Sequence, residues 1–122
     1  MHENVIVLGA SDNPERYSNK AIKMLTEKGH KVFPIHPKLK EINGIKVYSN
    51  LSEIEDVTIN TITLYVNPEI SSTLADAIIS IKPQRVIFNP GTENPALEEI
   101  LHKAKIQTIE ACTLVMLSIS QF

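Results

Sequence analysis

The sequence predicts an α/β domain whose mainly parallel, doubly wound sheet of five to six strands is covered by helices on both faces. Short runs rich in Val, Ile and Thr alternate with longer runs whose apolar residues recur at helical spacing. Strands that alternate with crossover helices pair in parallel, and a parallel sheet needs a helical layer on each face. The 122 residues show no internal repeat and no long linker, so we expect one domain over residues 1–122.

The first unit is a strand, a helix and a second strand. Residues 4–8 form an apolar run, and residues 18–28 place Ala, Ile, Met and Leu at spacings that bury one helical face. Gly29 follows that helix at the position where a left-handed residue commonly ends one. The apolar run at residues 31–35 then predicts a second strand parallel to the first.

Turn and capping signals define the next segment. Asn43-Gly44 is typical of a tight turn and precedes a short strand at residues 45–48. Ser52 and Glu55 have the spacing of a capping box, which predicts a brief helix there. Both elements would lie between the second strand and the next long one.

A third strand–helix pair follows. Residues 59–66 are rich in Ile, Thr and Val, which favours a strand. Asn67-Pro68 has the form of a capping residue followed by a first-turn proline, so a helix opens there. Apolar residues then recur at helical spacing, and Pro83 ends this single predicted helix.

The last third of the chain repeats the alternation. Residues 85–88 and 106–109 predict strands. Between them Asn94 is the expected cap of a helix that has Pro95 at its first position. The apolar stretch at residues 114–119 predicts a short final helix.

The overall composition excludes several classes of protein. The net charge of −2 and the pI near 6.1 argue against a nucleic-acid-binding surface, which is usually strongly basic. The single cysteine, Cys112, leaves no internal disulfide and fits a reducing compartment. Strand residues begin by Val5, which leaves no room for a signal peptide, and no apolar run reaches the ~20 residues of a membrane span. We therefore expect a cytoplasmic protein without a nucleic-acid or membrane partner.

Polar and turn-forming residues gather where the expected strands end. In open α/β sheets ligands bind beyond the carboxyl ends of the strands, at the point where the strand order reverses. The segments at such positions are residues 9–18, 36–40, 66–68, 89–93 and 110–113. We expect these segments to meet at one edge of the sheet and to hold a ligand there.

The first of these segments has the features of a phosphate site. Gly9 ends the first strand, and a short polar loop leads to a helix that opens at Ser18. Unpaired N–H groups and the positive end of the helix dipole favour an anion at a helix N-terminus. Gly9 would let the backbone approach the ligand, although a simple tight turn also explains it. Ser11 and Ser18 are candidate donors to phosphate oxygens, with Ser18 also the expected N-cap.

The charges near these loops indicate which nucleotide is bound. NAD-binding domains carry three glycines at the first turn and an acidic residue at the end of the second strand. Here the first turn has only Gly9, and His36 and Lys38 follow the second strand in place of a carboxylate. These groups, with Arg16, favour a ribose that carries a phosphate. NADP fits the charges but not the glycine-poor turn. Coenzyme A carries a 3′-phosphate and a pyrophosphate, so it needs both a basic rim and an anion-binding turn. The charges therefore favour coenzyme A, and the spacing alone leaves both nucleotides open.

Several segments together resemble one family over the whole chain. In order they are Gly9-Ala10-Ser11, Pro14-x-Arg16-Tyr17-Ser18, Pro34-Ile35-His36-Pro37, Glu41-Ile42-x-Gly44, Leu51-x-x-Ile54, Asn67-Pro68, Asn89-Pro90-Gly91-Thr92-Glu93 and Glu110-Ala111-Cys112-Thr113. This pattern resembles the small stand-alone CoA-binding proteins and is similar to the N-terminal domain of the succinyl-CoA synthetase alpha subunit. The resemblance implies a Rossmann-type domain that binds coenzyme A or an acyl-CoA. The synthetase's phosphohistidine lies in a second domain, so no residue here inherits that role.

The candidate ligand-binding residues follow from the position of the loops at the strand ends and from the family resemblance. They are Gly9, Ala10, Ser11, Arg16, Tyr17, Ser18, His36, Pro37, Lys38, Val66, Asn67, Pro68, Asn89, Pro90 and Gly91. Lys38, with Lys40 second, is the candidate for the 3′-phosphate, although two loop lysines can also be only a solvated surface. Tyr17 either covers the nucleotide or packs on its own loop. No catalytic set and no metal-ligand cluster stands out, so we expect binding without catalysis.

Three alternatives stay open. The same fold could serve as an NAD(P)-binding redox enzyme or regulator. The apolar tail, residues 114–122, could dock on a partner protein or on a second copy of the chain. Cys112 could form a mixed disulfide with the thiol of coenzyme A, although free cysteines are commonly small buried apolar residues.

Overall fold

Five parallel strands form the central sheet of the protein. The computed structural model describes residues 2–122. The strands are β1 (Asn4–Leu8), β2 (Lys31–Ile35), β5 (Thr61–Leu64), β6 (Arg85–Phe88) and β7 (Gln107–Glu110). Their order is β2-β1-β5-β6-β7, and every neighbouring pair is parallel. The predicted α/β class with a parallel sheet is therefore confirmed.

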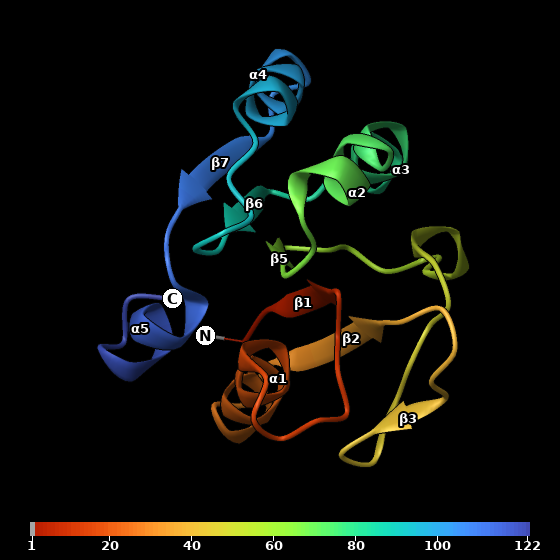
Figure 1. Cartoon of the computed structure of the whole chain (residues 1–122), viewed down its shortest axis with the longest axis vertical. Helices are drawn as coiled ribbons and strands as arrows, with labels where there is room; N and C mark the ends of the chain where they lie inside the picture. Colours follow the sequence, from red (N-terminus) through yellow and green to blue (C-terminus); the bar gives the residue numbers. More distant parts are fainter. Residues whose placement is uncertain (1) are drawn as a thin grey trace.

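Helices cover both faces of this sheet, as the doubly wound prediction requires (Figure 1). One layer holds α1 (Tyr17–Glu27) and α5 (Thr113–Ser118), which contact each other. The other layer holds α2 (Pro68–Ser72), α3 (Ala75–Ile81), α4 (Pro95–Lys103) and the 3₁₀ helix η1 (Leu51–Glu53). None of the helices within residues 2–122 combines the length and the apolar character needed to span a membrane.

The side chains of β1 alternate between two hydrophobic cores. Val5 and Val7 pack in the core that also contains Ile22 and Leu25 of α1. Ile6 faces the opposite core, which α3 and α4 complete. Because a parallel central strand is buried on both faces, its residues are apolar without interruption. Residues 5–7 are accordingly fully buried.

A small hairpin beside β2 carries the predicted tight turn. It consists of β3 (Glu41–Ile42) and β4 (Ile45–Lys46), which pair antiparallel. Asn43 and Gly44 both have positive φ, 51° and 80°, as a type I′ turn requires. The sequence predicted β4 but missed β3, because a two-residue strand has too few positions to show a period.

The predicted single helix after Asn67 is instead two short helices, α2 and α3. The break falls after three consecutive hydroxyl residues. Thr73 Oγ1 donates to the Ile70 carbonyl at 2.7 Å, and Ser71 Oγ donates to the Pro68 carbonyl at 3.3 Å. Such side-chain bonds to the backbone compete with the helical ladder. The apolar spacing was correct, but it does not reveal a break of this kind.

The cap of η1 also differs from the prediction. Asn50, not Ser52, is the N-cap, and its Oδ1 accepts a hydrogen bond from the Ser52 amide at 3.0 Å. Glu53 Oε1 accepts from the Ser49 amide at 2.5 Å. The expected Ser52–Glu55 capping box is therefore wrong, because the same kind of motif lies two residues earlier.

The strand order reverses at β1, whose two neighbours are β2 and β5. There the chain turns at Gly9 with φ of 91°. A Cβ at this position would lie 2.8 Å from both the Tyr65 carbonyl oxygen and Val66 Cγ1. Gly9 is therefore required by the close approach of the β1 and β5 ends as well as by its own backbone conformation.

Replacing Gly9 with alanine should destabilise the protein strongly. Left-handed backbone strain and the steric clash together should lower the free energy of unfolding by about 3 kcal/mol. Gly44→Ala is the matched control, because Gly44 also has positive φ but a Cβ there would meet nothing within 4 Å. This control should lose only about 1 kcal/mol in urea denaturation. Equal losses in the two variants would contradict the close contact at Gly9.

Candidate functional site

A cleft of about 680 Å³ lies at the carboxyl ends of the strands. Its walls come from the loops that follow β1, β2, β5 and β6, which the sequence places far apart. The lining residues are Gly9, Ala10, Ser11, Glu15, Arg16, Tyr17, Ser18, His36, Tyr65, Val66, Asn67, Pro90, Gly91 and Thr92. The cleft therefore occupies the switch point of the sheet, where this fold class binds its ligands.

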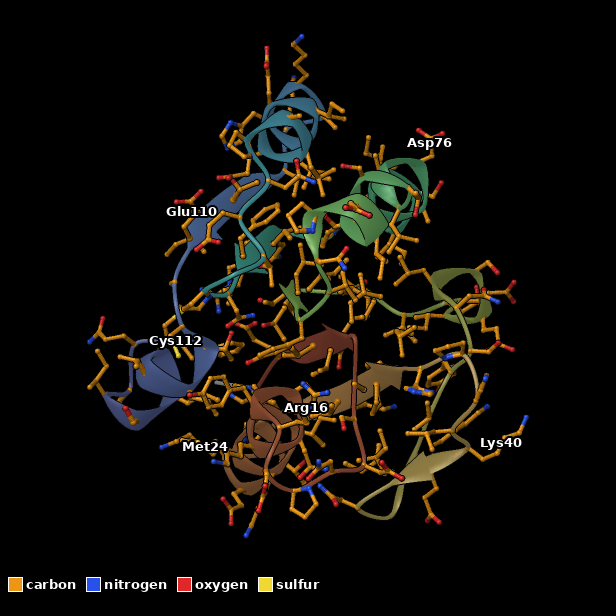
Figure 2. All side chains as sticks on the ribbon, in the orientation of Figure 1. Arg16, Met24, Lys40, Asp76, Glu110 and Cys112 are labelled. Atoms are coloured by element: carbon orange, nitrogen blue, oxygen red, sulfur yellow. The ribbon has the colours of Figure 1, made fainter. Side chains whose placement is uncertain are left out.

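Most of the predicted residues line this cleft, and four do not. Pro37, Lys38, Pro68 and Asn89 lie outside the lining, while Glu15, Tyr65 and Thr92 are additions that the sequence reasoning missed. Pro37 instead lines a neighbouring cavity of about 570 Å³ together with Lys40 and Lys46. In Figure 2 Lys40 lies on the β3–β4 side of the molecule, and Arg16 lies at α1.

The N-terminus of α1 opens on the cleft without a side-chain cap. The N-cap residue is Arg16, which makes no capping hydrogen bond, and the first turn contains no acidic residue. Ser18, the expected cap, lies inside the first turn and is buried, so that prediction was wrong. By contrast, Asn67 and Asn94 cap α2 and α4, as predicted. The first-turn amides of α1 are thus left for another acceptor.

The loop before α1 is held by its own side chains. Ser11 Oγ accepts from the Asn13 amide at 3.1 Å, and Asn13 Oδ1 accepts from the Glu15 amide at 3.0 Å. Asn19 Nδ2 donates to the Ser11 carbonyl at 2.8 Å, which ties the loop to the helix. These bonds form successive side-chain turns that fix the path of the backbone. Arg16 is therefore presented at the cleft by a preformed loop.

A turn after β2 supplies the next wall of the cleft. His36 is half-buried, and its Nδ1 accepts hydrogen bonds from the amides of Lys38 and Leu39, both at 3.0 Å. The side chain of Lys38 is exposed just beyond this turn. Within residues 2–122, no group of three or more His, Cys, Asp or Glu side chains is placed to hold a metal ion.

Asn89 supports the cleft from inside the protein. Its Nδ2 donates to Thr63 Oγ1 at 2.7 Å and to the Leu64 carbonyl at 2.8 Å, while its Oδ1 accepts from the Thr113 amide at 2.9 Å. The Thr63 and Thr113 hydroxyls are also hydrogen-bonded to each other at 2.8 Å. This buried network joins β5, β6 and α5, so the side chain of Asn89 is used for structure.

Tyr65 is among the residues that line the cleft, and its hydroxyl is buried. Within residues 2–122, no group lies at a distance and angle that would give the Oη atom a well-formed hydrogen bond. Burial raises the pKa of Tyr65 from 10.0 to about 12, and the nearby Thr113 and Thr63 hydroxyls offset part of that effect. The sequence reasoning missed this residue, because it looks like any aromatic residue at the end of a strand.

The C-terminal segment has contacts within the chain. The Phe122 ring lies 5.2 Å from the His30 ring and 4.6 Å from the Arg85 guanidinium carbon. Cys112 is a free, half-buried thiol at the start of α5 and does not line the cleft (Figure 2). Val115 and Ile119 of the same segment are exposed. The predicted docking of this tail on another protein therefore stays a prediction.

Comparisons with known proteins find matches along most of the chain. Residues 3–118 match the family model described as the CoA binding domain. The uncharacterized protein YneT of Bacillus subtilis is 34% identical over 53 residues, which is 43% of this chain and 39% of YneT. The ADP-forming acetate–CoA ligase II subunit alpha of Pyrococcus furiosus is 35% identical over 51 residues, which is 41% of this chain and 11% of that subunit.

A solved structure supports the fold over the full length of the chain. The crystal structure of an uncharacterized protein superposes with a TM-score of 0.93 and 40% sequence identity, covering 100% of this chain and 99% of that chain. The match to the curated relatives covers well under two thirds of their lengths. This chain therefore corresponds to only a part of those curated relatives.

Tyr65 should make stability fall at alkaline pH. Between pH 10 and about 12 the unfolded chain releases the phenolic proton while the folded protein keeps it. Wild-type protein should therefore lose about 2–3 kcal/mol of unfolding free energy relative to Tyr65→Phe across that interval, with no further change above it. At neutral pH the variant should stay within about 1 kcal/mol of wild type, because the Tyr65 hydroxyl interacts only weakly with the Thr113 and Thr63 hydroxyls. The unfolding free energies of both proteins are measured by denaturant titration at each pH. If the difference between wild type and Tyr65→Phe stays constant from pH 10 to about 12, the raised pKa of Tyr65 is refuted.

Proposed function

The chain belongs to the CoA-binding domain family, and on that premise we propose that it binds coenzyme A or an acyl-CoA in the cleft beside Gly9 without catalysing a reaction. The observation that carries the proposal is the uncapped N-terminus of α1 at the cleft. A helix end with free amides and a positive dipole is suited to a pyrophosphate.

The geometry of the turn before α1 agrees with a diphosphate. Gly9 brings the backbone close to the β5 end and leaves no side chain between the backbone and the cleft. Arg16 adds a planar guanidinium with several donors at the same position. A neutral or cationic ligand would leave both features without a partner.

The ribose and the pantetheine arm of the ligand would lie along the carboxyl ends of the strands. In this fold the ribose of a bound nucleotide lies near the end of the second strand. Here that position offers His36 and, next to it, the exposed Lys38. The pantetheine arm would then extend past Val66 and Asn67 toward Pro90, which line the other side of the cleft.

The lining of the cleft favours binding over catalysis. Glu15 is the one carboxylate among the lining residues, and His36 is the one imidazole. The Nδ1 atom of His36 is already committed to two backbone amides. Within the described residues, no hydrogen bond joins the Glu15 carboxylate or His36 Nε2 to a hydroxyl of the lining, as a nucleophile activated by a base would require.

Isothermal titration of the whole chain with coenzyme A tests the proposal. We expect micromolar or tighter affinity, no turnover of acetyl-CoA, and weaker binding of NADPH and NADH. Binding of NADPH in preference to coenzyme A would instead support a redox enzyme or regulator. Absence of any coenzyme A binding at micromolar concentrations would refute the proposal.

Charge reversal at Lys38 tests where the adenosine end lies. Lys38→Glu should weaken coenzyme A about tenfold, because a carboxylate would face the 3′-phosphate, and should hardly affect dephospho-CoA. Lys105→Glu is the matched control, since Lys105 is also exposed but precedes β7 at the opposite edge of the sheet. An equal loss for both ligands would exclude Lys38 from the 3′-phosphate site.

A further inference from the structure

The imidazole of His36 is held in a single orientation by the turn that follows it. Its Nδ1 accepts from the Lys38 and Leu39 amides, both at 3.0 Å. Its own amide donates to the Tyr48 carbonyl at 3.0 Å, which anchors the backbone at the end of β2. Hydrogen bonds from the backbone amide of His36 and to its ring nitrogen therefore hold the ring in place.

This arrangement determines which ring nitrogen carries the proton. A nitrogen that accepts two amide hydrogen bonds has no hydrogen of its own. The single proton of the neutral imidazole must then lie on Nε2, which makes that atom a donor. No hydrogen bond joins His36 Nε2 to another group in residues 2–122. A fixed donor without a protein acceptor therefore lines the cleft.

The position of this donor indicates what it recognises. At the end of the second strand, NAD-binding domains have a carboxylate, which accepts hydrogen bonds from ribose hydroxyls. A hydrogen-bond donor at that position has the opposite preference. It favours a ligand group that accepts hydrogen bonds and donates none. A phosphate oxygen is such a group, whereas a ribose hydroxyl also needs an acceptor for its own proton. The neighbouring Lys38 adds positive charge on the same turn.

We propose that His36 determines specificity by donating from Nε2 to the phosphate on the ligand's ribose, an inference that rests on the proposed binding of coenzyme A. The turn imposes the tautomer, and the tautomer selects a 3′-phosphorylated ribose over an unmodified one. A hydrogen bond to an ionised phosphate is also stronger than one between neutral groups.

Two substitutions separate the two nitrogens of His36. In His36→Asn the side-chain oxygen takes the place of Nδ1 and can accept from the same amides, but nothing replaces Nε2. In His36→Gln the amide nitrogen can reach the place of Nε2, but the acceptor for the turn is lost. Binding of coenzyme A and dephospho-CoA is measured by titration, together with the melting temperature of each variant.

We expect His36→Asn to melt close to wild type and to bind coenzyme A about tenfold more weakly, with dephospho-CoA affinity changed less than about twofold. His36→Gln should melt about 4 °C lower and keep most of the preference for coenzyme A. An Asn variant that keeps the full preference, or loses affinity equally for both ligands, would overturn the proposal. Failure of wild-type protein to bind either ligand would instead refute the proposed function itself.

Discussion

The close contact between the ends of β1 and β5 is the constraint on which the site depends. The Tyr65 amide donates to the Leu8 carbonyl at 2.8 Å, and the Ala10 amide donates to the Ile35 carbonyl at 3.0 Å. These bonds continue the parallel ladder past the last residues of the strands and bring three strand ends together. Only a residue without a Cβ fits at Gly9. The close contact at Gly9 therefore determines both the floor of the cleft and the direction of the loop to α1.

The sequence was sufficient to predict the fold because the strong periodic segments all agree with it. Apolar runs, helix caps at Asn67 and Asn94, and the turn at Asn43 each specify local structure that the parallel sheet can use. The features that were predicted wrongly are those that do not depend on the periodic spacing of apolar residues. The break between α2 and α3 comes from hydroxyl groups that bond to the backbone, as Thr73 does. The cap at Asn50 was missed because two overlapping motifs compete for the same segment.

The candidate site was predictable by position but not by side-chain direction. Strand ends meet at one edge of a parallel sheet, so the loops at Gly9, His36 and Pro90 could be grouped from sequence. Whether a side chain faces the ligand or the interior depends on local backbone angles that sequence does not reveal. Asn89 turns inward and accepts from the Thr113 amide, whereas Tyr65 lines the cleft but buries its hydroxyl.

The placement of β1 beside β5 also has a consequence for folding. The pairs β1–β2, β5–β6 and β6–β7 each join the two strands of one strand–helix–strand unit. In the pair β1–β5, by contrast, Val5 pairs with Thr61, far along the chain. Closing that long loop costs more entropy than closing the others, and such nonlocal pairings slow folding. We expect the two halves of the sheet to form first and to join at β1 and β5 afterwards. The cleft would then be among the last parts of the molecule to take shape.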